Sequence, residues 1–278
     1  MKIITYAHQH DGIDRLGIFT DGQITPLNLS PGDFYAQGIS AMQDLASSGE
    51  PTIAIDDVIV RPVVPSANKI ICVGLNYRKH AEESGMEAPP TPILFSKFNN
   101  AIAGHNENIP IASTWKAVDY EAELVVIIGK NGRYIPESDA LNHVLGYTCG
   151  NDLSERHFQI GQAGGQWLLG KTMDKFLPIG PYLVTAGEIP NPQTLAIKGW
   201  LNGELRQNSN TSDMIFSVAQ VIAYASQFFT LHAGDIISTG TPEGVILGMK
   251  EKHYMQVGDS YIIEIDGIGQ LTNTLVEE

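Results

Sequence analysis

VDYEAELVVIIG, residues 118–129, joins a cluster of acids to an uninterrupted run of apolar residues. Successive side chains of a β-strand point to opposite faces, so Glu121 and Glu123 would share one face, about 7 Å apart along the strand. Asp119 has the same parity. Neighbouring carboxylates beside buried apolar residues raise the free energy unless a cation binds them. The segment therefore predicts a buried strand with a metal-binding carboxylate pair; a solvated acidic strand face is the alternative.

A third acid follows another predicted strand. HVLGYTCGN (143–151) reads as a buried strand, and Asp152 stands where that strand would open into a loop. We expect Arg156 and Gln159 to share a helical face with Asp152, which would put a cation and an amide beside the acid. A turn-forming aspartate and a surface helix with an ion pair are the alternatives. If the acids meet, their oxygens suit Mg²⁺, Mn²⁺ or Ca²⁺ and argue against zinc held by thiolates.

A histidine near a glutamate is the candidate proton-transfer group. In GLNYRKHAEE (74–83), His80 and Glu83 have the spacing that brings side chains together on one helical turn. Glu83 would orient one imidazole nitrogen while the other faces water, which is the arrangement of a general base. An exposed helix with an accidental pair is the alternative. SGMEAPPTP (84–92) reads as a mobile loop whose closure would bring this base into action.

Two more segments carry candidate anion-binding groups. WLLGKTMD (167–174) places Lys171 after apolar and aromatic residues, where an ammonium suits a substrate carboxylate or oxyanion. Alternatively, its stem packs on an apolar surface with the charge in water. In ISTGTPEGV (237–245), Gly240-Thr241-Pro242 follows a predicted strand, and its N–H groups and hydroxyl can bind an anion or merely form a turn.

The rest of the main region is rich in strand-like apolar runs separated by glycine-rich turns. The clearest predicted strands lie at 69–75, 123–129, 143–150, 181–186, 235–240 and 260–275. Helical periodicity is strongest at 213–231, with Asp213 as the expected N-cap and Ala233-Gly234 as the stop. Because strands do not alternate regularly with helices, the sequence predicts a mixed α/β, β-rich fold and not a doubly wound sheet.

The first part of the chain predicts a small N-terminal α+β domain at 1–65, before a main domain at 66–278. Residues 2–28 hold short strands punctuated by a Thr20-Asp21-Gly22 turn. The stretch 33–49 predicts one helix, with Asp33 as the N-cap and Gly49 at its end. The proline-containing stretch 51–65 indicates a linker.

Composition restricts the class of protein. The 278 residues are 43% apolar and 17% charged, with a net charge of -14, which argues against a nucleic-acid partner. This charge would repel an anionic substrate unless a local cation reversed the field, which favours a bound metal. No apolar run approaches the ~20 residues of a membrane span, and MKIITYAHQHDG does not read as a secretory signal. Cys72 and Cys149 are expected to be buried free thiols in a cytoplasmic protein.

Six segments in order resemble the fumarylacetoacetate hydrolase family over about residues 66–275. They are GLNYRKHAEE (74–83), DYEAELVVIIGK (119–130), GYTCGNDLSERHFQ (146–159), WLLGKTMDKFLPIGP (167–181), LNGELRQ (201–207) and STGTPEGV (238–245). The similarity extends to bacterial acylpyruvate hydrolases and to 2-hydroxyhepta-2,4-diene-1,7-dioate and 5-carboxymethyl-2-hydroxymuconate isomerases. It implies a mixed β-sandwich roll, usually a homodimer, with a Mg²⁺ or Mn²⁺ site.

The resemblance also implies residue roles. Metal ligands would be Glu121, Glu123 and Asp152; the catalytic groups would be His80, Glu83 and Lys171; and the substrate-binding residues would be Tyr77, Arg156, Gln159 and Thr241. Asp119 falls outside the matched ligands and would support them.

The family pattern is broken at two places. FSKFNNAIAGHNENI (95–109) has Phe98-Asn99-Asn100 in place of the family's proline-rich FxKPxS pattern, and Ile246 stands where many relatives continue a glycine-rich loop. Both places border the expected pocket, which points to a different substrate. We expect them to leave the metal site untouched.

These residues predict a hydrolase that cleaves a C–C bond in a 2,4-dioxo acid. His80, held by Glu83, would activate the water, and the metal would stabilise a pyruvate enolate. Decarboxylation of oxaloacetate or isomerisation of a 2-hydroxymuconate-type dienoate would use the same metal, and the His80–Glu83 pair favours hydrolysis over both. A non-catalytic acidic domain that binds Ca²⁺ is the alternative from another class.

Overall fold

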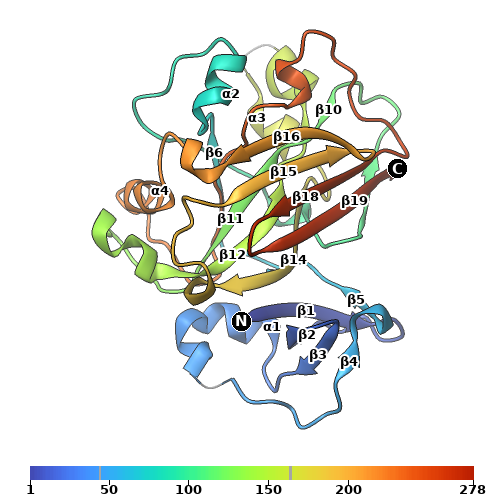
Figure 1. The fold of residues 1–278 in the computed structure, drawn as a ribbon, viewed down its shortest axis with the longest axis vertical. Helices are drawn as coiled ribbons and strands as arrows, with labels where there is room; N and C mark the ends of the chain where they lie inside the picture. Colours follow the sequence, from blue (N-terminus) through green and yellow to red (C-terminus); the bar gives the residue numbers. More distant parts are fainter. Residues whose placement is uncertain (44, 163–164) are drawn as a thin grey trace.

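The computed structural model describes residues 1–43, 45–162 and 165–278, in which two β-sheets dominate (Figure 1). Along its main path the larger sheet has the order β4 (Ile53–Ala54), β3 (Gln23–Pro26), β2 (Arg15–Thr20), β1 (Lys2–His8), β14 (Leu177–Thr185), β12 (Val144–Asn151), β11 (Ala122–Ile128), β17 (Ile236–Ser238), β6 (Ile70–Gly74) and β7 (Ile93–Ser96). Off this path, β5 (Val58–Val60) pairs with β1, and β8 (Ile102–Ala103) pairs with β14.

A second sheet crosses in front of β11 and β12 in Figure 1. Its order is β16 (Glu204–Asn210), β15 (Ala196–Leu201), β18 (Ser260–Ile265), β19 (Gly269–Glu277) and β9 (Asn108–Ile111). A short ribbon joins β10 (Val118–Asp119) to β13 (Ser154–Glu155). The α-helices of the described residues are α1 (Pro31–Gln37), α2 (Arg78–Glu83), α3 (Trp167–Lys171) and α4 (Val218–Ala225). This arrangement confirms the β-rich mixed fold.

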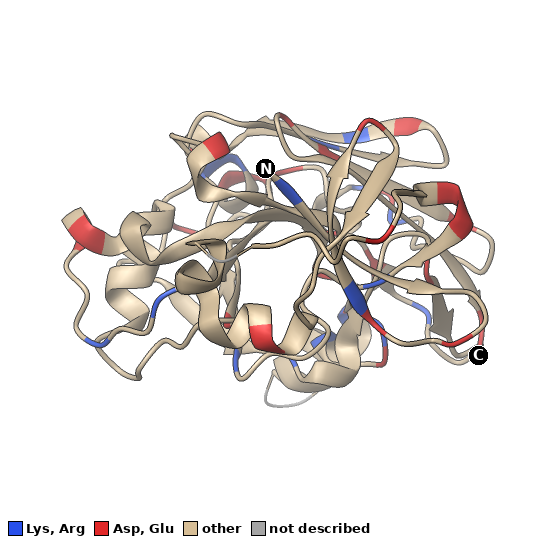
Figure 2. Cartoon of the chain, turned by 90° about the horizontal axis from the view of Figure 1, so that it is seen from below, with Lys and Arg blue, Asp and Glu red and all other residues tan. Residues whose placement is uncertain are grey.

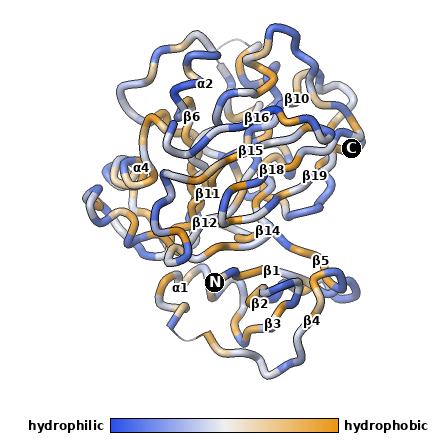
Figure 3. Tube along the Cα trace, viewed as in Figure 1, coloured by the Kyte–Doolittle hydropathy of each residue, from blue (hydrophilic) through white to orange (hydrophobic). Residues whose placement is uncertain are grey.

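Strand β11 lies in the middle of the core, between β12 and β17. Every residue of β11 is buried, and its side chains alternate between two apolar clusters. Leu124 and Val126 join the cluster that includes the second sheet, whereas Val125 and Ile127 join the cluster beneath α1. Burial on both faces explains why the sequence is a continuous apolar run (Figure 3). The same rigid strand carries the acids to one end of the sheet.

Both predicted helices were longer than the helices in the structure. Helix α1 begins at Pro31 with Ser30 as its N-cap, and Asp33 lies in its first turn. It ends at Gln37 because Gly38 has a positive φ and the N–H of Ile39 donates to the carbonyl of Gly129. A 3-10 turn follows, and position 44 lies outside the described residues. Helix α4 starts only at Val218, after a capping box formed by Ser217.

Helix α4 does not start at Asp213 as predicted, because the backbone of Phe216 is hydrogen-bonded to the side chain of Asn76. The side chain of Asn76 accepts from Phe216 N–H at 2.9 Å and donates to the Phe216 carbonyl at 3.0 Å. Asp213 belongs to a separate 3-10 turn. The helix ends at Ala225, and the hydroxyl of Ser226 then accepts from Ile135 N–H at 2.9 Å.

The N-terminal residues form the lower part of the molecule in Figure 1. The sheet nevertheless continues through them, because Lys2 and Ile3 of β1 are paired with β14. The stretch predicted as a linker includes β5, which pairs with β1, and Val63 and Val64, which are fully buried. It is therefore a packed part of the fold.

Basic and acidic residues are interspersed along the fold in Figure 2. Both cysteines are buried and free. Within residues 1–43, 45–162 and 165–278, none of the helices combines the length and the apolar character that crossing a bilayer demands.

Candidate metal centre and active site

Glu121, Glu123 and Asp152 meet at one end of the larger sheet. Glu121 directly precedes β11 and Glu123 lies within it, while Asp152 directly follows β12, whose pairing sets Ala122 opposite Asn151. One carboxylate oxygen from each acid lies within 4.8 Å of the others. The three side chains are at most 6% exposed, so the solvated-face alternative for the strand is wrong. Strand parity and the strand-end position of Asp152 bring these acids together as predicted.

Lys171, at the end of α3, lies against this cluster. Its ammonium donates to Glu121 Oε2 at 2.7 Å and to Asp152 Oδ2 at 2.9 Å. The residue is 2% exposed, so its charge does not reach water. Burial alone would lower the pKa of Lys171, but Asp152 and Glu121 raise it above its ordinary value. Lys171 is therefore a fixed cation at the carboxylate cluster.

A second buried lysine, Lys97, was not singled out from the sequence. Its ammonium forms an ion pair with Asp152 Oδ1 and donates to the carbonyls of Leu153, at 2.9 Å, and Phe176. Burial lowers the pKa of Lys97, although Asp152 opposes this shift. Lys97 lies just before the altered residues Phe98-Asn99-Asn100, and it is the residue of the FSKFNN segment that contacts the ligand Asp152.

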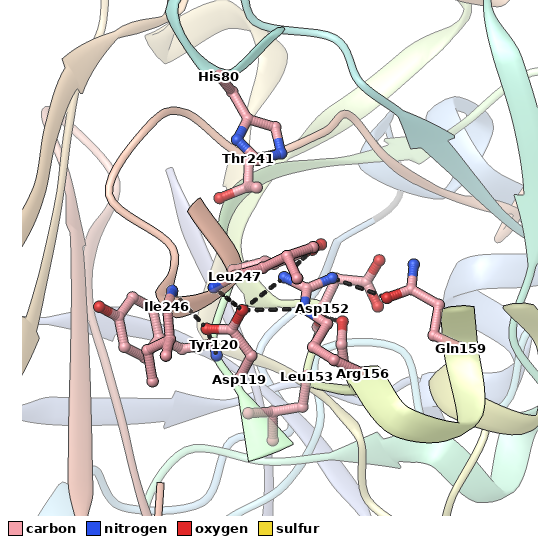
Figure 4. Close-up of polar contacts among 12 residues, drawn as sticks. His80, Asp119, Tyr120, Asp152, Leu153, Arg156, Gln159, Thr241, Ile246 and Leu247 are labelled. Atoms are coloured by element: carbon pink, nitrogen blue, oxygen red, sulfur yellow. Dashed lines mark hydrogen bonds and ion pairs between the residues drawn. The ribbon is translucent and has the colours of Figure 1, made fainter. Parts of the chain in front are cut away.

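Arg156 connects the cluster to another acid, Asp119. Its Nε donates to Asp119 Oδ2 at 2.9 Å, and its second terminal nitrogen lies 2.8 Å from both Asp119 Oδ2 and Glu121 Oε1. The remaining nitrogen donates to Gln159 Oε1 at 2.9 Å (Figure 4). The predicted helical face shared with Asp152 is wrong, because β13 intervenes and Arg156 only begins a short π-helix.

The pKa values of Glu121 and Glu123 are shifted in opposite directions. Burial, with Asp152 and Glu121 close by, raises the pKa of Glu123 to about 8. Both hydrogen bonds that Glu123 receives go to Oε2, from Ser238 Oγ at 2.5 Å and from Gly240 N–H at 2.9 Å. Burial opposes ionisation of Glu121 most strongly, but Lys171 and Arg156 hold the pKa of Glu121 below its ordinary value. A raised pKa for one acid among several is typical of a cluster that a cation would stabilise.

The charge balance fits a cation. Within the described residues, ion pairs connect three buried cations, Lys97, Lys171 and Arg156, to Asp119, Glu121 and Asp152, and Glu123 is the fourth acid of this charged group. One negative charge is left over when all are ionised. A divalent ion would make the cluster positive, which suits an anionic substrate in a protein of net charge -14. The all-oxygen donor set fits Mg²⁺, Mn²⁺ or Ca²⁺.

His80 and Glu83 lie side by side on α2, as their spacing predicts. His80 Nδ1 is 3.6 Å from Glu83 Oε2, which is longer than a hydrogen bond, and this buried nitrogen has no other partner in the described residues. Glu83 instead accepts from Gly244 N–H at 2.9 Å. The loop that follows β17 therefore holds the glutamate, and the glutamate faces the histidine.

The last two predicted substrate-binding residues are positioned differently. The Thr241 hydroxyl donates to the carbonyl of Ala122 at 3.0 Å and accepts from Gln207 at 2.9 Å. It thus ties its loop to the start of β11. Tyr77 is fully buried, its hydroxyl has no partner among the described residues, and it does not line the cavity.

A cavity of about 190 Å³ opens onto the carboxylate cluster. Its polar lining comprises His80, Ser84, Glu121, Glu123, Arg156, Gln159, Lys171 and Thr241. Phe95, Trp167 and Leu247 form part of its apolar wall. The rings of Phe95 and Trp167 meet edge to face at 5.3 Å, and a Cβ on Gly74 would lie 2.9 Å from the Trp167 ring. The cavity therefore combines an apolar wall with a charged lining at the carboxylate cluster.

The β-rich fold and the buried carboxylate cluster define a site able to bind a divalent cation. Residues 69–276 match the family model described as "Fumarylacetoacetate (FAA) hydrolase C-terminal". The chain belongs to the fumarylacetoacetate hydrolase family of enzymes.

Individual relatives carry different activities in their names. "Oxaloacetate tautomerase FAHD2B, mitochondrial" from Bos taurus is 42% identical over 247 residues, covering 88% of this chain and 79% of the relative. The structure of fumarylacetoacetate hydrolase from Exiguobacterium antarcticum is similar with a TM-score of 0.89 and 33% identity, over 100% of both chains. That of 5-carboxymethyl-2-hydroxymuconate delta-isomerase from Mycobacterium smegmatis has a TM-score of 0.83 and 32% identity, also over 100% of both.

Proposed function

We propose that this protein is an isomerase that interconverts the enol and keto forms of oxaloacetate or a similarly short 2-oxo dicarboxylate. The observation that carries the proposal is the cavity of about 190 Å³, with His80 in its wall and fixed cations at the carboxylate cluster. Pockets for larger ligands usually measure roughly 300–1,000 Å³. The names of the tautomerase and isomerase relatives support the same class of reaction.

Tautomerisation needs a base at C3 and an acid at the 2-oxo oxygen. In the keto-to-enol direction, His80 takes a proton from C3 as the C2–C3 double bond forms and then gives this proton to the oxygen on C2. The Lys171 ammonium keeps its charge and stabilises the negative charge that develops on that oxygen. The reverse direction moves the proton from the oxygen back to C3 through His80. Because Nδ1 of His80 faces Glu83, Nε2 is the nitrogen left for the substrate.

The remaining polar groups bind and orient the substrate. Arg156 and Gln159 hydrogen-bond to each other and line the cavity, where a guanidinium and an amide can hold a carboxylate. Glu121, Glu123 and Asp152 would hold the divalent cation, which when bound supplies Lewis-acid polarisation of the 2-oxo group.

The hydrolase prediction is less well supported than its isomerase-type alternative. Hydrolysis of a 2,4-dioxo acid requires room for the acyl group and for a water beside His80, in a cavity of only about 190 Å³. Pyruvate would be a product of both hydrolysis and oxaloacetate decarboxylation, whereas tautomerisation releases none. Pyruvate formation therefore separates these reactions.

The test follows enol absorbance after addition of the Mg²⁺-loaded protein to enol-oxaloacetate, with a parallel assay for pyruvate. We expect faster loss of the enol without pyruvate release, and no cleavage of acetylpyruvate. Pyruvate formed from either compound at the tautomerisation rate would overturn the proposal.

His143 supplies a matched control for the role of His80. We expect His80→Ala to lower kcat about 100-fold or more, which is the usual contribution of a positioned general base. His143 is also buried, but it bonds to the carbonyl of Lys130 and to Asp139, away from the cavity. His143→Ala should retain kcat in the folded protein; equal losses in both variants would remove His80 from the proposed role.

A further inference from the structure

Asp119 is the most heavily bonded acid near the site, yet it does not line the cavity. It is fully buried. Its Oδ1 accepts from Ile246 N–H at 2.9 Å, and its Oδ2 accepts from Leu247 N–H at 3.0 Å. The same Oδ2 accepts from Arg156 Nε at 2.9 Å (Figure 4). One carboxylate thus holds a charged side chain and a backbone turn together.

The turn held by Asp119 belongs to a loop, residues 240–248, that reaches both sides of the cavity. Near its start, the hydroxyl of Thr241 bonds to the Ala122 carbonyl. In its middle, Gly244 N–H donates to Glu83, which faces His80. At its end, Leu247 lines the cavity. The Asp119 contacts fix this last part of the loop.

Arg156 is shared between two acids. The same terminal nitrogen lies 2.8 Å from Asp119 Oδ2 and 2.8 Å from Glu121 Oε1. Without the charge on Asp119, the guanidinium would be drawn towards Glu121 alone, because the low dielectric of a buried site strengthens that attraction. Arg156 would then be less available to a substrate carboxylate.

We propose that Asp119 is a positioning residue for substrate binding: it sets the place of the Arg156 guanidinium and of the Ile246–Leu247 wall at the same time. This inference rests on the proposed function, since it takes the ligand to be a small 2-oxo dicarboxylate. Asp119 acts through Arg156 and Leu247 and does not touch the substrate itself. Its loss therefore weakens binding of the anionic ligand more than it slows the reaction.

Asp235 provides a matched control in the same chain. It is also fully buried, and it accepts from two backbone N–H groups, those of Lys69 at 3.0 Å and His232 at 2.7 Å. Its cationic partner is Lys69, at 2.8 Å. Asp235 lies outside the cavity lining. Replacing either aspartate with asparagine therefore removes a comparable buried charge, but only one of the two changes affects Arg156.

The experiment compares Asp119→Asn with Asp235→Asn in the full-length protein loaded with Mn²⁺. Oxalate is the binding probe, because it presents the paired oxygens of a 2-oxo acid and is not turned over. We expect Asp119→Asn to raise the oxalate Kd and the oxaloacetate KM at least about tenfold, the effect of losing one charged hydrogen bond. The kcat should change less than KM. Asp235→Asn should lower Tm without changing Kd or KM.

An oxalate Kd in Asp119→Asn equal to that of the wild type, with a Tm loss matching Asp235→Asn, would show a purely structural role and overturn the inference. If Asp119→Asn does not fold, Asp119→Glu keeps the charge but moves it by one methylene. We expect this variant to raise the oxalate Kd about threefold or more, and an unchanged Kd would overturn the inference. If the wild type binds oxalate but does not turn over oxaloacetate, the proposed function fails while the oxalate comparison still tests Asp119.

Discussion

Replacing Lys97 with methionine tests the electrostatic description of the site. Lys97→Met keeps the length and apolar volume of the stem but removes the ammonium that contacts Asp152 and the carbonyls of Leu153 and Phe176. Because Lys97 is 2% exposed and Asp152 is fully buried, water cannot replace the lost partner. The change leaves a buried carboxylate paired only with Lys171.

The expected loss of stability follows from burial. Removing one partner of a buried ion pair typically costs about 3–5 kcal/mol of unfolding free energy. In a protein larger than 150 residues, 1 kcal/mol corresponds to a Tm change of roughly 2–4 °C. We therefore expect Lys97→Met to unfold roughly 10 °C below the wild type.

Differential scanning calorimetry on metal-free protein measures this change. Lys175→Met is the control, because Lys175 pairs with Glu107 at 2.9 Å and the side chains of both residues are exposed, by 37% and 31%. Solvation of that pair should limit the loss to about 1 kcal/mol. Equal Tm values for Lys97→Met and the wild type, or equal losses in the two variants, would refute the reasoning.

Two further predictions concern the cavity. Because the pKa of Glu123 is raised to about 8, a proton competes with the metal for this carboxylate. The Mn²⁺ affinity measured by calorimetry should therefore rise about tenfold per pH unit from pH 6 and level off above pH 8. An affinity that does not change with pH would contradict the assignment of Glu123 as a ligand. A Cβ at Gly74 would lie 2.9 Å from the Trp167 ring, so Gly74→Ala should push the ring into the cavity and raise the oxaloacetate KM several-fold. Gly187→Ala, where a Cβ meets nothing within 4 Å, should leave KM unchanged, and equal KM values for both variants would refute the role of Trp167.

Local patterns in the sequence were sufficient to find the carboxylate cluster. Alternation along a strand is a property of neighbouring residues, so Glu121 and Glu123 could be assigned to one face. Asp152 was found because a continuous apolar run ends just before it. Lys171 and Arg156 were also singled out, but their shared contact with Glu121 could not be found in this way. Lys97 and Asp119 reach their contacts through tertiary structure, and nothing in the flanking residues encodes those distances.

The second sheet shows a different limit of sequence patterns. The residues of β15 alternate in burial, but a glycine, Gly199, occupies one of the buried positions and leaves space for the hydroxyl of Tyr261. Strand β16 is almost wholly polar, and only Gln207 is buried along its length. Gln207 is retained there because it bonds to Ala122 N–H and to Thr241. Strand β16 therefore has no apolar signal, and its pairing with β15 defines it.

The most direct test of the central claim is a calorimetric titration of the metal-free protein with Mn²⁺, for the wild type and for Glu123→Gln. The glutamine keeps the shape of the side chain and can still accept from Ser238, but it removes the charge from the carboxylate cluster. We predict one bound ion per chain in the wild type and no detectable binding in Glu123→Gln. Equal binding by both proteins, or none by the wild type, would contradict the assignment of Glu121, Glu123 and Asp152 as the metal site.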